Sequence, residues 1–248
     1  AGLLVLKGVG AGGRWRTCRS RSWGMRQTSL DKAPMTRKLP EVAIAYDFDG
    51  TLSPGNMQEY DFIPKLGMTP ARFWSKANEL ARQCDGDLIL AYLNLMLNEA
   101  RARGVPIRRD DFVAYGRKVT LFPGVQTWFD RINAYGRQQG LAVRHYIVSS
   151  GLREMVQGSP IASQFARVFA SAFAYDVHGV AYAPALALNY TTKTQYLFRI
   201  NKGTLDVWDN RVINAYQPQA QRPVPFSRMI FLGDGETDVP CMRLVKDQ

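Results

Sequence analysis

The sequence has few cysteines and histidines and no long hydrophobic run. Its 248 residues include three cysteines, none of them in a CxxC pair, and two histidines. So few cysteines exclude a disulfide scaffold and are typical of reduced thiols in a cytoplasmic protein. No stretch of about 18 apolar residues is present, which excludes a transmembrane helix. The hydrophobic fraction of 46% excludes wholesale disorder, and the length predicts one large domain or one domain with an insertion.

Acidic residues are scarce in the first 40 residues, and this scarcity explains most of the net charge. The chain has a formal net charge of +11 at pH 7. Residues 1–40 contain nine lysines and arginines against one acid, Asp31, so they contribute +8 and the remaining 208 residues only +3. A basic chain suggests a nucleic-acid partner. Because the rest of the chain is nearly balanced, we expect neither a nucleic-acid nor a membrane partner.

The basic segment at 1–40 is rich in glycine, arginine and serine and has no helix or strand period. Its composition fits an organellar transit peptide, an RNA-binding arm, or a disordered leader translated upstream of the protein's own start. The chain begins with Ala1, and Met25 and Met35 shortly precede the first apolar run, which favours the leader. The chain also ends soon after its last motif, so we expect an incomplete C-terminal end.

The rest of the chain alternates strands and helices. Apolar runs at 42–46, 141–148 and 228–232 predict buried strands, with a short strand at 168–170 and a hairpin around 177–179. Helical spacing is present at 125–135, where Val125, Trp128, Phe129, Ile132 and Tyr135 share one stripe, and helices are also predicted at 152–166 and from Lys193. This pattern predicts an α/β fold with a doubly wound (Rossmann-like) parallel sheet.

Residues 53–118, between the first two strands, are predicted to be helical. Thr69 and Pro70 are a typical N-cap and first helical residue, and Leu88 to Ala100 is strongly apolar. We therefore expect a core at 41–52 and 119–248, interrupted by a helical insertion.

Polar motifs follow three of the predicted strands, at 47–51, 149–151 and 233–238. Ligands of parallel sheets bind beyond the carboxyl ends of the strands, so these motifs are expected to form one site. Asp47 and Asp49 are two residues apart beside Gly50, and Asp234 and Asp238 add further carboxylates. Carboxylates brought together need a cation or a proton between them, and an oxygen-only set suits Mg²⁺.

The remaining motif residues carry groups that suit an anion. Ser149, at a strand-to-helix junction, can hold an anion, and Lys193 can neutralise a further charge. Together with the acidic cluster, they indicate phosphoryl transfer through an aspartate nucleophile. Two choices stay open: Lys202 is the alternative to Lys193, and Asp238 could cap a helix instead of supporting a metal.

Other reactive side chains are expected to be structural. His145 and His178 are read as a strand residue and a turn residue, and Cys241 as a small buried residue.

These motifs resemble those of the haloacid dehalogenase-like (HAD) superfamily of phosphohydrolases. DFDGTL at 47–52 matches the family's DxDGT loop, IVSSG at 147–151 resembles its second motif, and GDGETD at 233–238 resembles its fourth. The resemblance covers about residues 41–246. The helical insertion at 53–118 resembles the cap of the phosphoserine-phosphatase-like branch, which closes over small substrates, although the cap's acidic and basic substrate contacts do not align and Glu59 lies too far from Asp49.

The resemblance implies a role for each matching position. Asp47 would be the nucleophile, and Asp49 would protonate the leaving oxygen and then activate water. Asp47, the carbonyl of Asp49, and Asp234 would hold Mg²⁺, supported by Asp238. The phosphoryl group would be bound by Thr51, Ser149, Ser150, Gly151 and Lys193. Lys193 would also be catalytic, because it would stabilise the nucleophile.

The carboxylate of Asp49 points to a phosphatase. Dehalogenases and P-type ATPases of the superfamily have a similar loop but no carboxylate at the position that matches Asp49. The expected function is thus Mg²⁺-dependent hydrolysis of a small phosphorylated metabolite. A phosphomutase of the same superfamily and a nucleic-acid-binding protein using the basic N-terminal arm are the alternatives, and the sequence leaves the substrate and the oligomeric state open.

Overall fold

A five-stranded, mostly parallel sheet forms the centre of the molecule. The computed structural model describes residues 39–248, so the predicted leader and nucleic-acid arm lie outside the described residues. The strands are β1 (Glu41–Tyr46), β2 (Ala142–Leu152), β3 (Phe165–Tyr175), β4 (Ala181–Leu186) and β5 (Met229–Leu232). Their order in the sheet is β4-β3-β2-β1-β5, and all neighbours are parallel except β3 and β4.

Helices connect the strands and cover both faces of the sheet. They are α1 (Phe62–Lys65), α2 (Pro70–Gln83), α3 (Leu88–Arg103), α4 (Arg109–Gly116), α5 (Val125–Gln138), α6 (Arg153–Gly158), α7 (Tyr190–Lys202), α8 (Asn210–Asn214) and α9 (Val239–Asp247). Among residues 39–248, no helix has both the length and the apolar character needed to cross a membrane.

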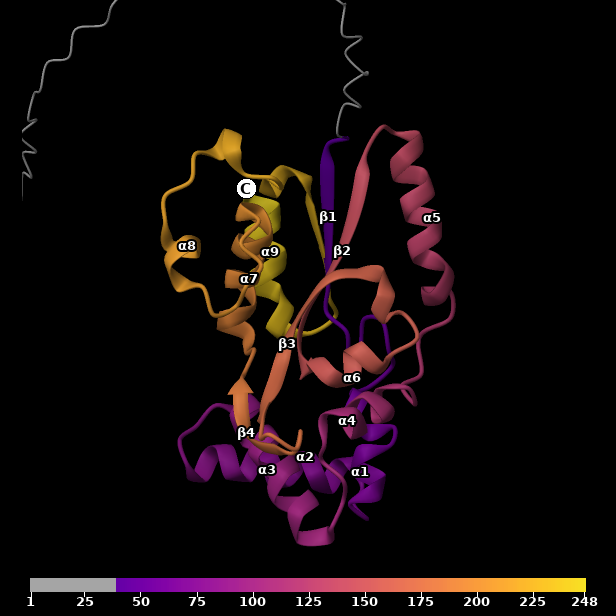
Figure 1. The fold of residues 1–248 in the computed structure, drawn as a ribbon, viewed down its shortest axis with the longest axis vertical. Coiled ribbons are helices and arrows are strands. Elements are labelled where there is room, and N and C mark those ends of the chain that lie inside the picture. Colours follow the sequence, from indigo (N-terminus) through magenta and orange to yellow (C-terminus); the bar gives the residue numbers. More distant parts are fainter. Residues whose placement is uncertain (1–38) are drawn as a thin grey trace, which may run out of the picture. The chain divides into compact units, whose positions relative to one another are not determined.

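Alternate residues of β1 pack on opposite faces of the sheet, which explains why its sequence is an unbroken apolar run. Ile44 and Tyr46 belong to a cluster with α5 and α6. Ala43 and Ala45 belong to a second cluster with α7 and α9. Figure 1 shows α5 on one side of β1 and α7 with α9 on the other. This arrangement confirms the predicted doubly wound α/β fold.

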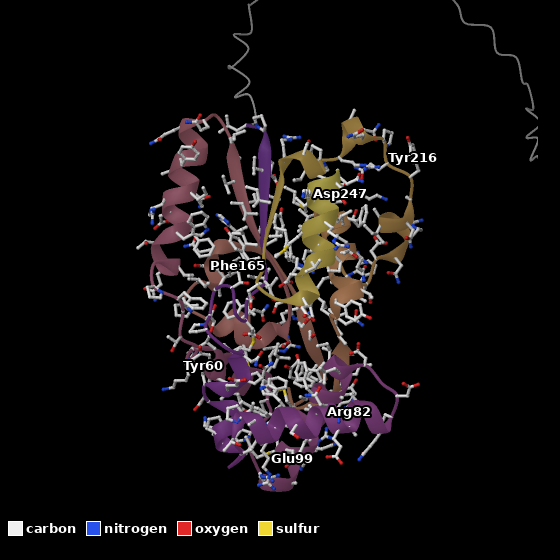
Figure 2. All side chains as sticks on the ribbon, turned by 180° about the vertical axis from the view of Figure 1, so that it is seen from behind. Tyr60, Arg82, Glu99, Phe165, Tyr216 and Asp247 are labelled. Carbon is white, nitrogen blue, oxygen red and sulfur yellow. The ribbon has the colours of Figure 1, made fainter. Side chains whose placement is uncertain are left out.

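The segment between β1 and β2 is helical, as predicted, and we call residues 53–118 the cap. The Thr69 side chain accepts a hydrogen bond from the Arg72 N–H and begins α2, and Asp87 caps α3 in the same way. Figure 1 shows the cap helices at the carboxyl end of the strands, and Figure 2 labels Tyr60, Arg82 and Glu99 in this part. Since cap and sheet residues share one hydrophobic cluster, the division into domains stays a prediction.

Three elements differ from the sequence prediction. β2 continues to Leu152, so Ser149 to Gly151 lie in the strand rather than after it. The predicted helix at 152–166 is only α6, because Gly158 and Pro160 interrupt it. β3 is one long strand whose end forms the predicted hairpin with β4. Within α5, Tyr135 was expected in the buried stripe but is 59% exposed.

Candidate active site

The loop after β1 begins with Asp47. The Asp47 N–H donates to the carbonyl of Leu232 at 2.8 Å, so the end of β1 remains paired with the end of β5. The chain then turns around the Phe48 carbonyl, which accepts a hydrogen bond from the N–H of Leu52 at 2.9 Å. The turn places Asp47 at the carboxyl end of β1, which lies between β2 and β5 in the sheet. The strand order reverses at this point, and ligands of doubly wound sheets bind at such a reversal.

The turn requires glycine at position 50. Gly50 has a φ of +81°, which other residues rarely adopt. A Cβ at this position would lie 2.1 Å from Oδ2 of Asp234, so the site also has no room for a larger residue. The neighbouring Thr51 hydroxyl donates to Oδ1 of Asp234 at 2.8 Å. The loop after β1 and the loop after β5 are therefore in direct contact.

Lys193 joins three parts of the site. The Asn189 side chain accepts hydrogen bonds from two backbone N–H groups and begins α7, which places Lys193 at the first turn of the helix. Its Nζ donates to Oδ2 of Asp47 at 2.9 Å and to Oδ1 of Asp238 at 2.8 Å. The Lys193 side chain is fully buried.

The alternative lysine lies elsewhere. Nζ of Lys202, at the other end of α7, donates to the carbonyls of Ile213 and Ala215. Of the two lysines that the sequence left open, Lys193 is therefore the one that the structure brings to Asp47.

Three carboxylates lie close enough to share a cation. Oxygen atoms of Asp47, Asp234 and Asp238 are all within 4.8 Å of one another. Lys193 offsets only one of their charges, and the donor set consists of oxygen alone. This combination fits a hard divalent cation such as Mg²⁺. Asp238 precedes α9, but its side chain makes no capping hydrogen bond to that helix and instead accepts from the Gly235 N–H at 3.2 Å.

The side chain of Asp49 is not part of the group of three carboxylates and faces the cap. Its Oδ1 accepts a hydrogen bond from the backbone N–H of Met57 at 2.9 Å. Burial and the nearby charge of Asp47 raise the pKa of Asp49 well above its usual range. This shift favours the protonated carboxyl, the form that can donate a proton.

Lys193 and Asp47 each change the pKa of the other. Burial and the charge of Asp238 raise the pKa of Asp47, although Lys193 opposes the shift. Burial alone would lower the pKa of Lys193. The charges of Asp47 and Asp238 together have a larger opposite effect, so the pKa of Lys193 is raised. The lysine therefore stays charged between the two carboxylates.

The second motif borders the same site from β2. The Ser149 Oγ is buried and accepts a hydrogen bond from the Gly151 N–H at 3.1 Å, whereas the buried Ser150 Oγ has no hydrogen-bond partner among the described residues. A Cβ on Gly151 would lie 2.3 Å from Cε of Met57 and 2.9 Å from Oδ2 of Asp49. Glycine at this position thus lets β2 approach both the first motif and the cap.

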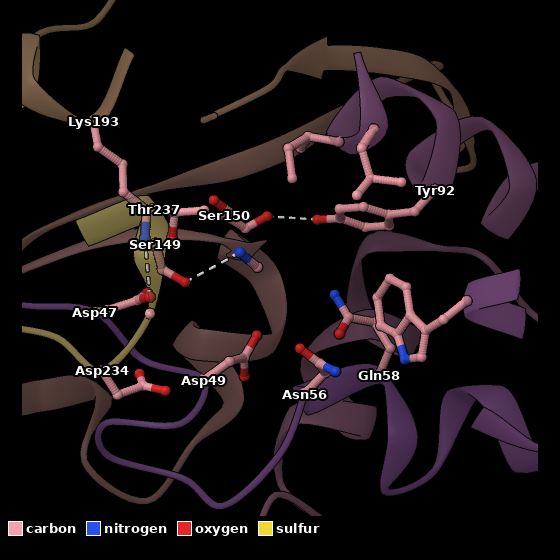
Figure 3. Close-up of a pocket in the computed structure, with 15 residues that line it drawn as sticks. Asp47, Asp49, Asn56, Gln58, Tyr92, Ser149, Ser150, Lys193, Asp234 and Thr237 are labelled. Carbon is pink, nitrogen blue, oxygen red and sulfur yellow. Dashed lines mark hydrogen bonds and ion pairs between the residues drawn. The ribbon is translucent and has the colours of Figure 1, made fainter. Parts of the chain in front are cut away.

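A cavity of about 310 Å³ lies between these motifs and the cap. Its lining residues are Asp47, Asp49, Asn56, Gln58, Trp74, Leu88, Ile89, Tyr92, Ser149, Ser150, Gly151, Lys193, Asp234, Gly235 and Thr237. Figure 3 shows Asp47, Asp49 and Asp234 on one side of this pocket and Asn56, Gln58 and Tyr92 on the other. Thr51, predicted to bind phosphate, is absent from the lining and contacts Asp234 instead.

Sequence reasoning missed the cap residues of the pocket. Asn56, Gln58, Trp74 and Tyr92 belong to no motif, and a helical pattern does not tell which polar residue faces a cavity. Asn56 and Trp74 are held by a common partner, since both donate to Oε1 of Glu59, at 2.7 and 2.6 Å.

Three residues that the sequence read as structural lie outside the pocket. His145 is buried in β2 between Tyr46 and Asn133, and burial lowers its pKa to about 4. His178 is in the turn between β3 and β4. Cys241 is buried in α9, and burial raises the pKa of its thiol to about 12, so the thiol stays protonated.

The doubly wound sheet thus carries an acidic cluster, a buried lysine and a capped pocket at the carboxyl ends of its strands. The family model described as haloacid dehalogenase-like hydrolase matches residues 44–243. The chain belongs to this family, as its motifs predicted.

Other comparisons extend this result. A Borreliella burgdorferi protein described as uncharacterized is 28% identical over 231 residues, which cover 83% of this chain and 79% of the relative. A HAD family hydrolase from Salmonella enterica serovar Typhi matches with a TM-score of 0.55 and 19% identity, over 82% of this chain and 59% of that chain. A substrate-bound phosphoserine phosphatase matches with a TM-score of 0.54 and 13% identity, over 81% of each chain. At these identities, the two structures show a shared fold.

Proposed function

We propose that this protein is a Mg²⁺-dependent phosphatase that hydrolyses a small phosphate monoester through an aspartyl-phosphate at Asp47. The observation that carries the proposal is the position of Lys193, whose ammonium bridges Asp47 and Asp238 at the base of the pocket. The ammonium holds the Asp47 carboxylate in a fixed orientation and favours its ionised form, as a nucleophile requires. The phosphoserine phosphatase that shares the fold supports the same reaction class.

In the first step, a carboxylate oxygen of Asp47 attacks phosphorus while the bond to the leaving alcohol breaks. Asp49, whose pKa is raised by burial and by Asp47, gives its proton to the leaving oxygen. Ser149, Ser150 and Lys193 also line the pocket, and we propose that they bind the phosphoryl oxygens. Positioning and charge stabilisation of this kind account for most of the rate in phosphoryl transfer.

In the second step, Asp49 accepts a proton from water, and the resulting hydroxide attacks phosphorus. The bond between phosphorus and Asp47 breaks, which releases phosphate and restores the carboxylate. Asp47, Asp234 and the carbonyl of Asp49 would hold Mg²⁺, with Asp238 in support. The bound ion would neutralise charge on the phosphoryl oxygens. We propose that the cap closes over the bound substrate and excludes bulk water during the chemistry.

Hydrolysis of a generic aryl phosphate tests the proposal. We expect release of phosphate that requires Mg²⁺, stops with a chelator and falls by at least about 10⁴-fold in Asp47→Asn, because the amide is not a nucleophile. The matched control is Asp130→Asn, at an exposed position of α5 outside the pocket, which should keep the wild-type rate. Equal rates for wild type and Asp47→Asn would show that the proposed nucleophile is wrong.

A further inference from the structure

The two walls of the pocket differ in charge. The wall formed by the sheet loops, which we call the core wall, carries Asp47, Asp49, Asp234 and Lys193. The wall formed by the cap, which we call the cap wall, consists of uncharged side chains: Asn56, Gln58, Trp74, Leu88, Ile89 and Tyr92. Among the residues described, Lys193 is the only cation that lines the pocket, and its ammonium already lies between two carboxylates.

No basic side chain of the cap lines the pocket, and three of them pair with acids elsewhere. Lys76 and Arg103 both pair with Glu99, and Lys65 pairs with Asp61. A substrate with a second anionic group would therefore lose hydration on the cap wall without gaining a cation. It would also face the acids of the core wall. Both effects disfavour an anionic leaving group.

The cap wall instead offers apolar surface. The rings of Trp74 and Tyr92 meet edge to face, with centroids 5.6 Å apart. Their polar atoms already have protein partners, since the indole N–H donates to Glu59 and the Tyr92 hydroxyl donates to the Ser150 carbonyl at 2.6 Å. The carbon surface of both rings is therefore what they contribute to the pocket.

One polar atom on this wall lacks a partner among the described residues. Gln58 is 1% exposed, and its Oε1 makes no hydrogen bond there, although the residue lines the pocket. Figure 3 shows Gln58 and Tyr92 across the pocket from Asp49. A buried acceptor without a donor is costly, and a donor on a bound molecule would satisfy it.

We infer that the leaving group of the substrate is an uncharged alcohol with an apolar or aromatic surface and a hydroxyl or N–H group that donates to Oε1 of Gln58. Its apolar part packs on Trp74 and Tyr92 while its phosphate lies at Asp47. The inference rests on the proposed phosphatase function and adds the chemical class of the alcohol.

A series of alkyl phosphates with leaving groups of similar basicity tests the charge requirement. We expect kcat/KM for benzyl phosphate and its ring-hydroxylated forms to exceed that for phosphoserine and phosphoglycolate by about 100-fold, because the cap wall has no cation to pair with their carboxylates. Faster hydrolysis of any of the charged esters would overturn the inference while leaving the phosphatase function intact. If no member of the series releases phosphate in an Asp47-dependent manner, the proposed function itself fails.

Gln58→Met tests the hydrogen bond, because methionine keeps the shape and lacks the acceptor. We expect the best hydroxybenzyl phosphate to lose its advantage over benzyl phosphate, with the ratio of their kcat/KM values falling about 10-fold. The melting temperature should rise by about 2–4 °C, since the variant removes an unpartnered buried oxygen. Gln83→Met, on an exposed part of α2 outside the pocket, should keep the ratio. An unchanged ratio in Gln58→Met would overturn the role of Gln58.

Leu88→Arg tests the cap wall's lack of charge directly. Leu88 and Leu90 are both at the start of α3 and are 41% and 43% exposed, but only Leu88 lines the pocket. A new arginine at Leu88 should raise kcat/KM for phosphoglycolate relative to benzyl phosphate by about 10-fold. Leu90→Arg should leave this preference as it is. The inference is wrong if the two variants behave alike.

Discussion

The core wall and the cap wall of the pocket are built differently, although they face each other. The core wall is held by hydrogen bonds and ion pairs among segments far apart in the sequence, and Lys193 connects the loops after β1 and β5. The cap wall consists of uncharged side chains, most of them on α2 and α3. It reaches the core wall through Tyr92, which donates to the Ser150 carbonyl, and through Met57, which donates to Asp49.

This difference separates two requirements of the proposed reaction. Reacting groups must be fixed to within a fraction of an ångström, and charged groups in mutual contact at strand ends meet this need. The alcohol is chosen by weaker contacts, which a helical cap can change without disturbing the core. We therefore expect substitutions in the core wall to abolish the reaction and substitutions in the cap wall to alter its rate and preference.

Apart from loss of the nucleophile itself, the largest effect in the core wall is expected for Lys193→Met. Without the ammonium, Asp47 and Asp238 become unpaired buried carboxylates, which lowers the free energy of unfolding by about 3–5 kcal/mol. The nucleophile also loses its fixed orientation, so kcat should fall by about 10³-fold or more. Chemical denaturation in the absence of Mg²⁺ and phosphatase assays with Mg²⁺ measure the two effects.

Lys202→Met provides the comparison on the same helix. Lys202 donates to two backbone carbonyls outside the pocket. Its loss should cost about 1–2 kcal/mol of stability and leave the rate of catalysis unchanged. Similar loss of activity in both variants would contradict the assignment of Lys193.

A smaller effect is expected for Gly50→Ala. The added Cβ would meet the carboxylate of Asp234 and force a left-handed backbone on alanine. We expect activity to fall by about 100-fold, because Asp234 must move away from the site, and stability to fall by about 1–3 kcal/mol. Gly67→Ala separates the two causes. Gly67 also has a positive φ, of +63°, but a Cβ added there would have no neighbour within 4 Å, so this variant should lose stability and keep its activity.

The same contrast explains what the sequence could predict. Asp47, Ser149 and Asp234 each follow or end an apolar run, although alternate residues of β5 are exposed, and the carboxyl ends of parallel strands meet at one edge of the sheet. Their proximity therefore follows from sequence and topology. The choice between Lys193 and Lys202 did not follow, because both lie on one helix and only its packing against the sheet decides which ammonium reaches Asp47.

The cap wall carried no comparable signal. Gln58 and Trp74 look like ordinary polar and aromatic positions of short helical segments, and tertiary packing decides that they face a cavity. Thr51 shows the same limit within a strong motif. The sequence assigned its hydroxyl to the phosphate, but the turn at Gly50 brings it to Asp234.

The strand that carries Ser149 shows a third limit of the sequence. A register shift in the pairing of β2 with β3 follows Ser149, so that Leu152 pairs next. Ser150 and Gly151 are thus part of a bulge, which a strand pattern does not reveal.

The smallest effect is expected where the two walls meet. Tyr92→Phe keeps the ring on the cap wall and removes the hydrogen bond to the Ser150 carbonyl. We expect a loss of about 1 kcal/mol in stability and a fall of about 3–10-fold in kcat/KM, since the second motif loses its contact with the cap. Denaturation and steady-state kinetics measure the two quantities.

Tyr115→Phe is the matched variant for this contact. Tyr115 is also a buried cap tyrosine, and its hydroxyl donates to the Pro106 carbonyl at 2.8 Å, away from the pocket. It should lose a similar amount of stability, because the same kind of hydrogen bond is removed, but keep its kcat/KM. If Tyr92→Phe also loses only stability, the cap does not act on the second motif through this bond. Closure of the cap would then depend on the contact between Met57 and Asp49.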